Sequence, residues 1–212
     1  MLELADRTGV YCGKLLADMG ADVIKVERPG GDATRDIPPF KGDTPGSDRS
    51  LFFLYMNTSK RGVTLDLERP EGQGLFRRLV ETADLVVETS RPGTLDDLGL
   101  GYEALRELRP ELVLTSITGF GQNGPHRDFR SADIVAAAMG GAMTVTGEAE
   151  DPPTSLAGSQ SSVMASVCAA ASSMIALYRG AITGRGQHVD ISMQETIASV
   201  THICGVGKFI DD

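Results

Sequence analysis

The run Asp84-Leu-Val-Val-Glu88 indicates the fold, because short β-branched apolar segments of this kind recur along the chain with helical patterns between them. The other expected strands are Leu2–Leu4, Asp22–Glu27, Gly62–Leu67, Glu111–Ile117 and His188–Ser192. Helices are expected at Val10–Met19, Pro70–Thr82, Tyr102–Leu108, Ser131–Met139, Ser161–Gly180 and Met193–Cys204. This alternation predicts an α/β fold with a doubly wound, mainly parallel sheet.

The length of the chain limits the number of domains, and its net charge limits the kinds of molecule that it can bind. The 212 residues suit one large domain, spanning 1–212, or part of a larger one, and the chain stops just after an apolar helix as if cut. With 20 Lys and Arg against 29 Asp and Glu, the formal net charge is -9. That balance argues against binding to nucleic acid or an anionic membrane, so an anionic ligand needs a local cluster of cations.

Cysteine usage and hydropathy favour a soluble cytoplasmic protein. Cys12, Cys168 and Cys204 show neither disulfide-framework nor zinc-site spacing, so we expect no metal, and we interpret Cys12 and Cys168 as packing residues. No stretch approaches the ~18 uninterrupted apolar residues that a membrane span needs. The connection from Pro29 to Lys60 is long and rich in proline and glycine, which is typical of a functional loop or lid.

Two motifs suggest a nicotinamide site only weakly. Gly119-Phe-Gly-Gln-Asn-Gly124 has the G-x-G-x-x-G spacing after an expected strand, but Pro125 follows it and helical periodicity resumes only near Ala132. Glu27 ends another strand where a ribose-binding acid could lie. We favour a loop for the glycines and a surface carboxylate beside Arg28 for Glu27.

Basic residues gather where a parallel sheet binds ligands. Arg28 ends one expected strand, Lys60 and Arg61 form a pair entering another, and the loop Glu88–Gly93 follows a third. Ligands of open parallel sheets sit outside the carboxyl ends of the strands. Arg28 and this loop therefore occupy the expected edge, although basic loop residues are also commonly just solvated.

Five motifs in order resemble class III CoA-transferases, the family that includes formyl-CoA transferase and carnitine CoA-transferase. They are Gly20–Glu27, Asn57–Arg61, Val87–Gly93, Thr118–Pro125 and Thr183–Asp190. The resemblance covers about the first half of a usual member. It implies a Rossmann-like large domain, CoA or acyl-CoA as cosubstrate, and a dimer of interlocked ring-shaped chains.

The resemblance also implies site residues. Arg28 and Lys60 match positions that contact the CoA nucleotide, and Thr89 and Ser90 match a segment lining the same channel. Asp97 falls where some members place an arginine near a CoA phosphate. Arg91, six residues earlier, is the nearest cation that could compensate for this acid.

The catalytic aspartate of the family is replaced in this chain. In that family the aspartate lies twenty-two residues before the first glycine of Gly-Arg-Gly and nine after the Pro-Pro pair; here both counts reach Ser162. A serine can be acylated, but it cannot carry CoA as a thioester, and no Asp or Glu occurs between Pro152 and Val189. The histidine of the related racemases would fall at Ala132, and we interpret Asp133 as an ordinary helix or loop residue.

Three functional hypotheses follow. The first is a transferase moving CoA between an acyl-CoA thioester and a carboxylic acid, as a homodimer or as a heterodimer with a sister chain. The second is a non-catalytic acyl-CoA-binding subunit whose partner carries the aspartate. The third is an altered enzyme that uses Ser162 or Gln160 for hydrolysis or polarisation.

Overall fold

Six parallel strands form one sheet in the computed structural model, which describes residues 1–148 and 150–210, with side chains to 202. The strands are β1 Leu2–Leu4, β2 Ile24–Glu27, β3 Arg61–Thr64, β4 Leu85–Glu88, β5 Val113–Thr118 and β6 His188–Ser192. Their order is β3-β2-β1-β4-β5-β6, and every neighbouring pair is parallel. Helices cover both faces, which explains why the central strands β1, β4 and β5 are buried along nearly their whole length. The predicted α/β class is confirmed.

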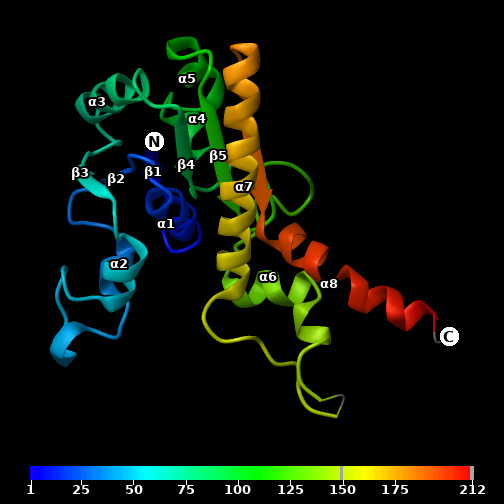
Figure 1. Ribbon diagram of the computed structural model, residues 1–212. Helices are drawn as coiled ribbons and strands as arrows, with labels where there is room; N and C mark the ends of the chain where they lie inside the picture. Colours follow the sequence, from blue (N-terminus) through cyan, green and yellow to red (C-terminus); the bar gives the residue numbers. More distant parts are fainter. Residues whose placement is uncertain (149, 211–212) are drawn as a thin grey trace.

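Two layers of helices enclose the sheet (Figure 1). Helices α1 (Val10–Asp18) and α7 (Gln160–Thr183) pack on one face, where Cys12 and Leu16 join the core. On the other face lie α3 (Pro70–Val80), α4 (Thr94–Asp97) and α5 (Tyr102–Leu108), centred on Phe76 and Val80. Helices α6 (Asp133–Met139) and α8 (Met193–Ile210) pack against each other beside the N-terminal end of α7. This layered core fixes the strand ends on which the site is built.

Helix α7 has two unlike faces. Its buried face carries small residues such as Ala165, Ala169 and Ser173, so the helix approaches β5 closely, and the Ser173 and Thr115 hydroxyls are hydrogen-bonded at 2.7 Å. Its opposite face exposes Ile175 and Tyr178, among other apolar residues. The helix is long and apolar enough to cross a membrane by length and composition, with a mean hydropathy of 1.5, but 44% of that window is buried. Its packing against the sheet accounts for its composition as a core helix.

Two glycines at the end of α7 have different roles. Gly184 adopts a left-handed φ of 67° and its N–H donates to the Gly180 carbonyl at 2.8 Å, which is a common helix end. Gly186 has no positive φ. A Cβ there would lie 1.8 Å from the Leu112 carbonyl oxygen, so this glycine serves the close approach of two backbones.

The Pro29–Lys60 connection is more ordered than its composition predicts. It contains helix α2 (Leu51–Met56) and two 3₁₀ turns, Ala33–Asp36 and Lys41–Asp43. The Ser50 hydroxyl caps α2 by accepting from the Phe53 N–H at 3.1 Å, and it donates to the Ile37 carbonyl at 2.6 Å. One buried serine thus ties the start of a helix to the segment before it.

Candidate active site

The strand order reverses between β1 and β4. Strand β1 leads into α1 on one face of the sheet, whereas β4 leads into α4 on the other, so the two loops diverge at their carboxyl ends. Open α/β sheets bind ligands in the crevice that such divergence leaves. The predicted edge-of-sheet location is therefore where the site should be sought.

Hydrogen bonds across this crevice join the two loops. The Asp6 N–H donates to Thr89 Oγ1 at 2.9 Å, and that hydroxyl donates to Asp6 Oδ1 at 2.9 Å. The Thr8 N–H also donates to Asp6 Oδ1, at 2.8 Å. These bonds fix the β1 and β4 loops relative to each other and give the crevice a rigid base.

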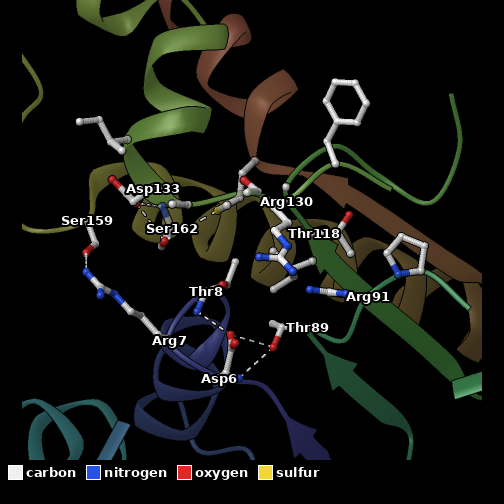
Figure 2. Close-up of a pocket in the computed structure, with 18 of the residues that line it drawn as sticks. Asp6, Arg7, Thr8, Thr89, Arg91, Thr118, Arg130, Asp133, Ser159 and Ser162 are labelled. Atoms are coloured by element: carbon white, nitrogen blue, oxygen red, sulfur yellow. Dashed lines mark hydrogen bonds between the residues drawn. The ribbon is translucent and has the colours of Figure 1, made fainter. Parts of the chain in front are cut away.

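A pocket of about 1000 Å³ opens above this base (Figure 2). It draws residues from the loops after β1, β4 and β5, from the start of α6, and from the segment that enters α7. Its charged lining residues are Asp6, Arg7, Arg91, Arg127, Asp128, Arg130 and Asp133. Cations outnumber acids there, the reverse of the whole chain, so the pocket supplies the local positive field that an anionic ligand requires.

Arg91 and Arg130 are two of these cations that share one part of the pocket. Both residues are exposed, and Figure 2 shows both guanidinium groups pointing into the same space beside Thr8. A guanidinium binds a carboxylate or phosphate through two parallel N–H donors. Two converging guanidinium groups repel each other unless an anion lies between them, so this part of the pocket suits a carboxylate or phosphate.

Ser162 lies at the inner end of the pocket, in the first turn of α7, and is 6% exposed. Its N–H and its Oγ–H both donate to Asp133 Oδ1, at 2.8 and 2.9 Å. The adjacent Ser161 hydroxyl donates to the Asp133 main-chain carbonyl at 3.0 Å. Three hydrogen bonds thus attach the start of α6 to the start of α7, and they place a carboxylate beside the serine.

The backbone that enters α7 is conformationally unusual. Ser159 has φ 57° and ψ 50°, a left-handed conformation that is unfavourable for a residue with a side chain. Its hydroxyl accepts from Arg7 Nη2 at 2.7 Å, across 152 residues of sequence. This contact with the β1 loop helps to hold the strained turn that precedes the Ser162 N–H, the donor to Asp133.

A second pocket, of about 560 Å³, lies on the other side of the Asp6 loop. Arg28 and Ser90 line it, together with residues that follow β2 and β3. Asp6 lines both pockets, and Thr89 in the first adjoins Ser90 in the second. The predicted residues are therefore divided: Thr89, Arg91 and Ser162 in the large pocket, Arg28 and Ser90 in the smaller one.

Lys60 reaches neither pocket. Its ammonium donates to Glu3 Oε2 at 2.7 Å, to the Val10 carbonyl at 2.9 Å and to Asn57 Oδ1 at 3.1 Å, and its side chain is 1% exposed. Lys25 binds the same Glu3 carboxylate at 3.3 Å. A cation with these partners has no free donor for a phosphate, so the structure argues against the ligand role that the resemblance implied and supports a structural one.

Two further sequence interpretations are corrected. Glu27 is 8% exposed and is bound by Arg35 at 2.7 Å, which holds the pKa of its carboxyl below the usual value, so it is not a surface carboxylate. Asp97 is exposed on α4 and lines neither pocket. Since it does not face the ligand space, Arg91 has no repulsion to compensate.

Cys12 and the glycine loop match the structural interpretations of the sequence, whereas Cys168 is only half-buried and lies outside the two core clusters. Cys12 is fully buried, and burial raises the pKa of its thiol to about 12, which suits packing and not nucleophilic attack. Cys168 is a free thiol, and the side chain of Cys204 lies outside the described residues. After β5 the chain enters no helix before α6 at Asp133, so Gly119–Gly124 is a loop, as predicted, and not a dinucleotide turn.

Sequence reasoning missed Asp133, Arg130 and Arg7 as site residues. Asp133 and Ser162 are 29 residues apart, and no periodic pattern links them. Arg130 comes from a loop without regular structure. The only sequence signal is positional: Arg7 follows one strand, and Arg130 and Asp133 lie in the long connection after another, so all three leave the carboxyl edge of a parallel sheet.

The sequence profile of CoA-transferase family III matches residues 7–205. The succinyl-CoA:mesaconate CoA-transferase of Haloarcula hispanica is 42% identical over 196 residues, which are 91% of this chain and 50% of that protein. The succinyl-CoA–D-citramalate CoA-transferase of Chloroflexus aurantiacus is also 42% identical, over 94% of this chain and 49% of that protein. The chain therefore spans about half the length of the curated relatives it matches.

A solved structure shows the same fold. The CAIB/BAIF family protein from Brucella suis superimposes with a TM-score of 0.92 at 37% identity, over 99% of this chain and 56% of that chain. The match covers the sheet and both helical layers. Sequence profile, relatives and fold agree, and the chain belongs to CoA-transferase family III.

Proposed function

We propose that the protein containing this chain transfers CoA from an acyl-CoA thioester to a free carboxylic acid. One observation supports this most directly: an arginine-lined pocket at the strand-order reversal has Ser162 and the Asp133 carboxylate at its inner end. A reaction between a thioester and two carboxylates needs cations for the anionic substrates and a carboxylate for acyl transfer. Both are present in one pocket.

CoA would lie across the two pockets. In this proposal Arg28 and Ser90 contact its nucleotide end in the smaller pocket, Thr89 and Arg91 line the passage, and the thioester reaches Ser162. The adjacency of the pockets on either side of Asp6 supports this path. Residues 1–212 then form the CoA-binding part of a longer enzyme, and no step calls for a metal.

Dicarboxylic acids are the substrate class we favour. Relatives are named for succinyl-CoA with mesaconate, for succinyl-CoA with D-citramalate, and for succinate with glutarate. A dicarboxylic acyl group keeps one free carboxylate after thioester formation. Arg91 and Arg130 converge where that carboxylate could bind, which gives the class a physical reason in this chain.

A further polypeptide segment would complete the enzyme. The exposed apolar residues of α7 include Ile175, Tyr178 and Ile182, at 67–71% exposure, and such surfaces are usually covered. The relatives are about twice as long, and one of them, 41% identical, is named as the BbsE subunit of a CoA-transferase from Thauera aromatica. We propose that the rest of the protein, or a second chain in a dimer, packs here, in the reducing cytoplasm where Cys12 and Cys168 stay free.

A transfer assay tests the proposed function. The complete protein is incubated with succinyl-CoA and either mesaconate, citramalate or glutarate, and the CoA esters are separated and identified by mass spectrometry. We expect a new CoA ester with a dicarboxylic acceptor and little or none with acetate. Release of free CoA without any new ester would instead indicate hydrolysis and would contradict the proposal.

A further inference from the structure

We propose that Asp133 is the nucleophile that carries the acyl group and then CoA, an inference that rests on the proposed function. Ser162 cannot form a CoA thioester, and the chain from Pro153 to His188 contains no carboxylate. The fold nevertheless brings the Asp133 carboxylate to 2.9 Å from Ser162 Oγ. In this proposal the nucleophilic carboxylate comes from the start of α6 instead of from α7.

The two oxygens of Asp133 have different surroundings. Oδ1 accepts two hydrogen bonds from Ser162, whereas no described residue donates to Oδ2. Asp133 also lines the large pocket and is partly exposed. One oxygen is thus held in place, and the other is available to attack a thioester in the pocket.

The bonds to Oδ1 are suited to stabilise the transition state. When a nucleophile attacks Cγ of an acylated Asp133, negative charge develops on the carbonyl oxygen, and the Ser162 N–H and Oγ–H already point at Oδ1. Both donors belong to the first turn of the 24-residue helix α7, whose N-terminal end carries partial positive charge. Preorganised donors of this kind form an oxyanion hole.

Each step of the proposed cycle balances in atoms and charge. Asp133 Oδ2 forms a bond to the acyl carbon, the C–S bond breaks, and CoA leaves as thiolate from the mixed anhydride. The thiolate then attacks Asp133 Cγ, the C–O bond breaks, and the donor acid leaves as carboxylate from an aspartyl-CoA thioester. The acceptor carboxylate then attacks Asp133 Cγ and releases the CoA thiolate, which attacks the acceptor carbon of the new mixed anhydride. The acceptor thus gains CoA, Asp133 leaves as a carboxylate, and no net proton is transferred.

Trapping with borohydride tests the assignment directly. The complete protein is incubated with succinyl-CoA without acceptor and treated with sodium borohydride, which reduces an aspartyl thioester to homoserine, and its peptides are mapped by mass spectrometry. We expect homoserine at position 133. The variants are Asp133→Asn, which keeps a side-chain oxygen to accept from Ser162, and Asp36→Asn, an exposed carboxylate that lines neither pocket.

The outcomes separate the two proposals. Asp133→Asn should lose the adduct and at least a thousandfold of the transfer rate, about 4 kcal/mol at the conversion of 1.36 kcal/mol per tenfold, while Asp36→Asn keeps both. An adduct on Ser162 or any other residue, or full transfer by Asp133→Asn, would overturn the role of Asp133 but leave CoA transfer standing. Mapping of the unsubstituted protein decides the matter even if the variant does not fold. Absence of both adduct and transfer would remove both proposals.

Discussion

Glu3 and Asp133 are two carboxylates placed by the same sheet in opposite environments. Glu3 is completely buried and is bound by the ammonium groups of Lys60 and Lys25. Asp133 is partly exposed in a pocket, and its Oδ1 is held by the uncharged donors of Ser162. A carboxylate enclosed by buried cations is a poor nucleophile and a strong structural tie, whereas one whose single oxygen is held by neutral donors leaves its other oxygen accessible to a substrate. The groups that donate to each carboxylate, ammonium groups for Glu3 and the Ser162 N–H and Oγ–H for Asp133, thus distinguish a structural carboxylate from the proposed nucleophile.

After the loss of transfer in Asp133→Asn, the largest effect expected from this comparison is on stability. Lys60→Met removes a cation from buried Glu3, and breaking a buried pair costs about 3–5 kcal/mol of unfolding free energy. We expect about 3 kcal/mol, because Lys25 remains near the carboxylate. Arg61→Met is the matched control, since the Arg61–Asp22 pair is 65% and 73% exposed and such pairs contribute about 0–1 kcal/mol. Urea unfolding measures both, and equal midpoints for the two variants would show that the Glu3 network is not a structural tie.

Removal of one oxyanion donor should come next in size. Ser162→Ala deletes the Oγ–H donor to Asp133 Oδ1 and leaves the Ser162 N–H in place. Loss of a single oxyanion donor lowers kcat by about 10²- to 10³-fold, and we expect the lower figure. Ser161→Ala provides the comparison, because its hydroxyl donates to the Asp133 main chain and not to the carboxylate. Steady-state kinetics showing equal losses in the two variants would contradict the special role of Oδ1.

The sequence was sufficient to predict the sheet but not which side chains bind the carboxylates of Glu3 and Asp133. Every strand was predicted within about three residues, because short segments rich in β-branched and apolar residues alternate with helical patterns along the chain. Helices α2 and α4 were missed, since six and four residues are too few to show a helical period. Lys60 was assigned to a ligand from the family resemblance, and no sequence pattern links it to its partner Glu3, 57 residues away. Asp133 was passed over because no pattern links it to Ser162, 29 residues away. Local sequence patterns show which segments reach the edge of the sheet. Contacts between residues far apart in the sequence decide which charged side chains are paired there and which are free to bind a ligand.

Substitution of a pocket arginine should have a smaller effect, and this effect should be on the affinity for succinyl-CoA. Arg130→Ala and Arg91→Ala each remove a guanidinium from the large pocket. A charge-assisted hydrogen bond is worth about 1.5–3 kcal/mol, so affinity for succinyl-CoA should fall about ten- to a hundredfold. Added salt should reduce the difference between variant and unsubstituted protein. Arg106→Ala, an exposed residue on α5 paired with Glu103, is the control in calorimetry. Unchanged affinity in both pocket variants would show that the anion binds elsewhere.

The smallest expected effect is a pH dependence of stability from His188. Burial lowers the pKa of this imidazole, which is hydrogen-bonded to Ser116 Oγ at 2.9 Å and stacked on Tyr102. The unfolded chain therefore binds a proton more readily, so stability is complete above the ordinary value of 6.5 and falls as the pH drops through it. His188→Gln should flatten this decline between about pH 7.5 and about pH 5.5 in urea titrations. A decline as steep as in the unsubstituted protein would assign it to another group.

Because the large pocket lies at the β1–β4 crevice, some segments of the chain can change in sequence without altering the pocket, and others cannot. Its charged lining comes from the loops after β1, β4 and β5 and from the start of α6, and the start of α7 adds uncharged serines, whereas the Pro29–Lys60 connection borders only the smaller pocket. Insertions or exchanged sequences in that connection would alter the surroundings of Arg28 while Asp133 and Ser162 keep their places. The same chemical centre could in this way be joined to different recognition surfaces by changes in one loop that borders the smaller pocket.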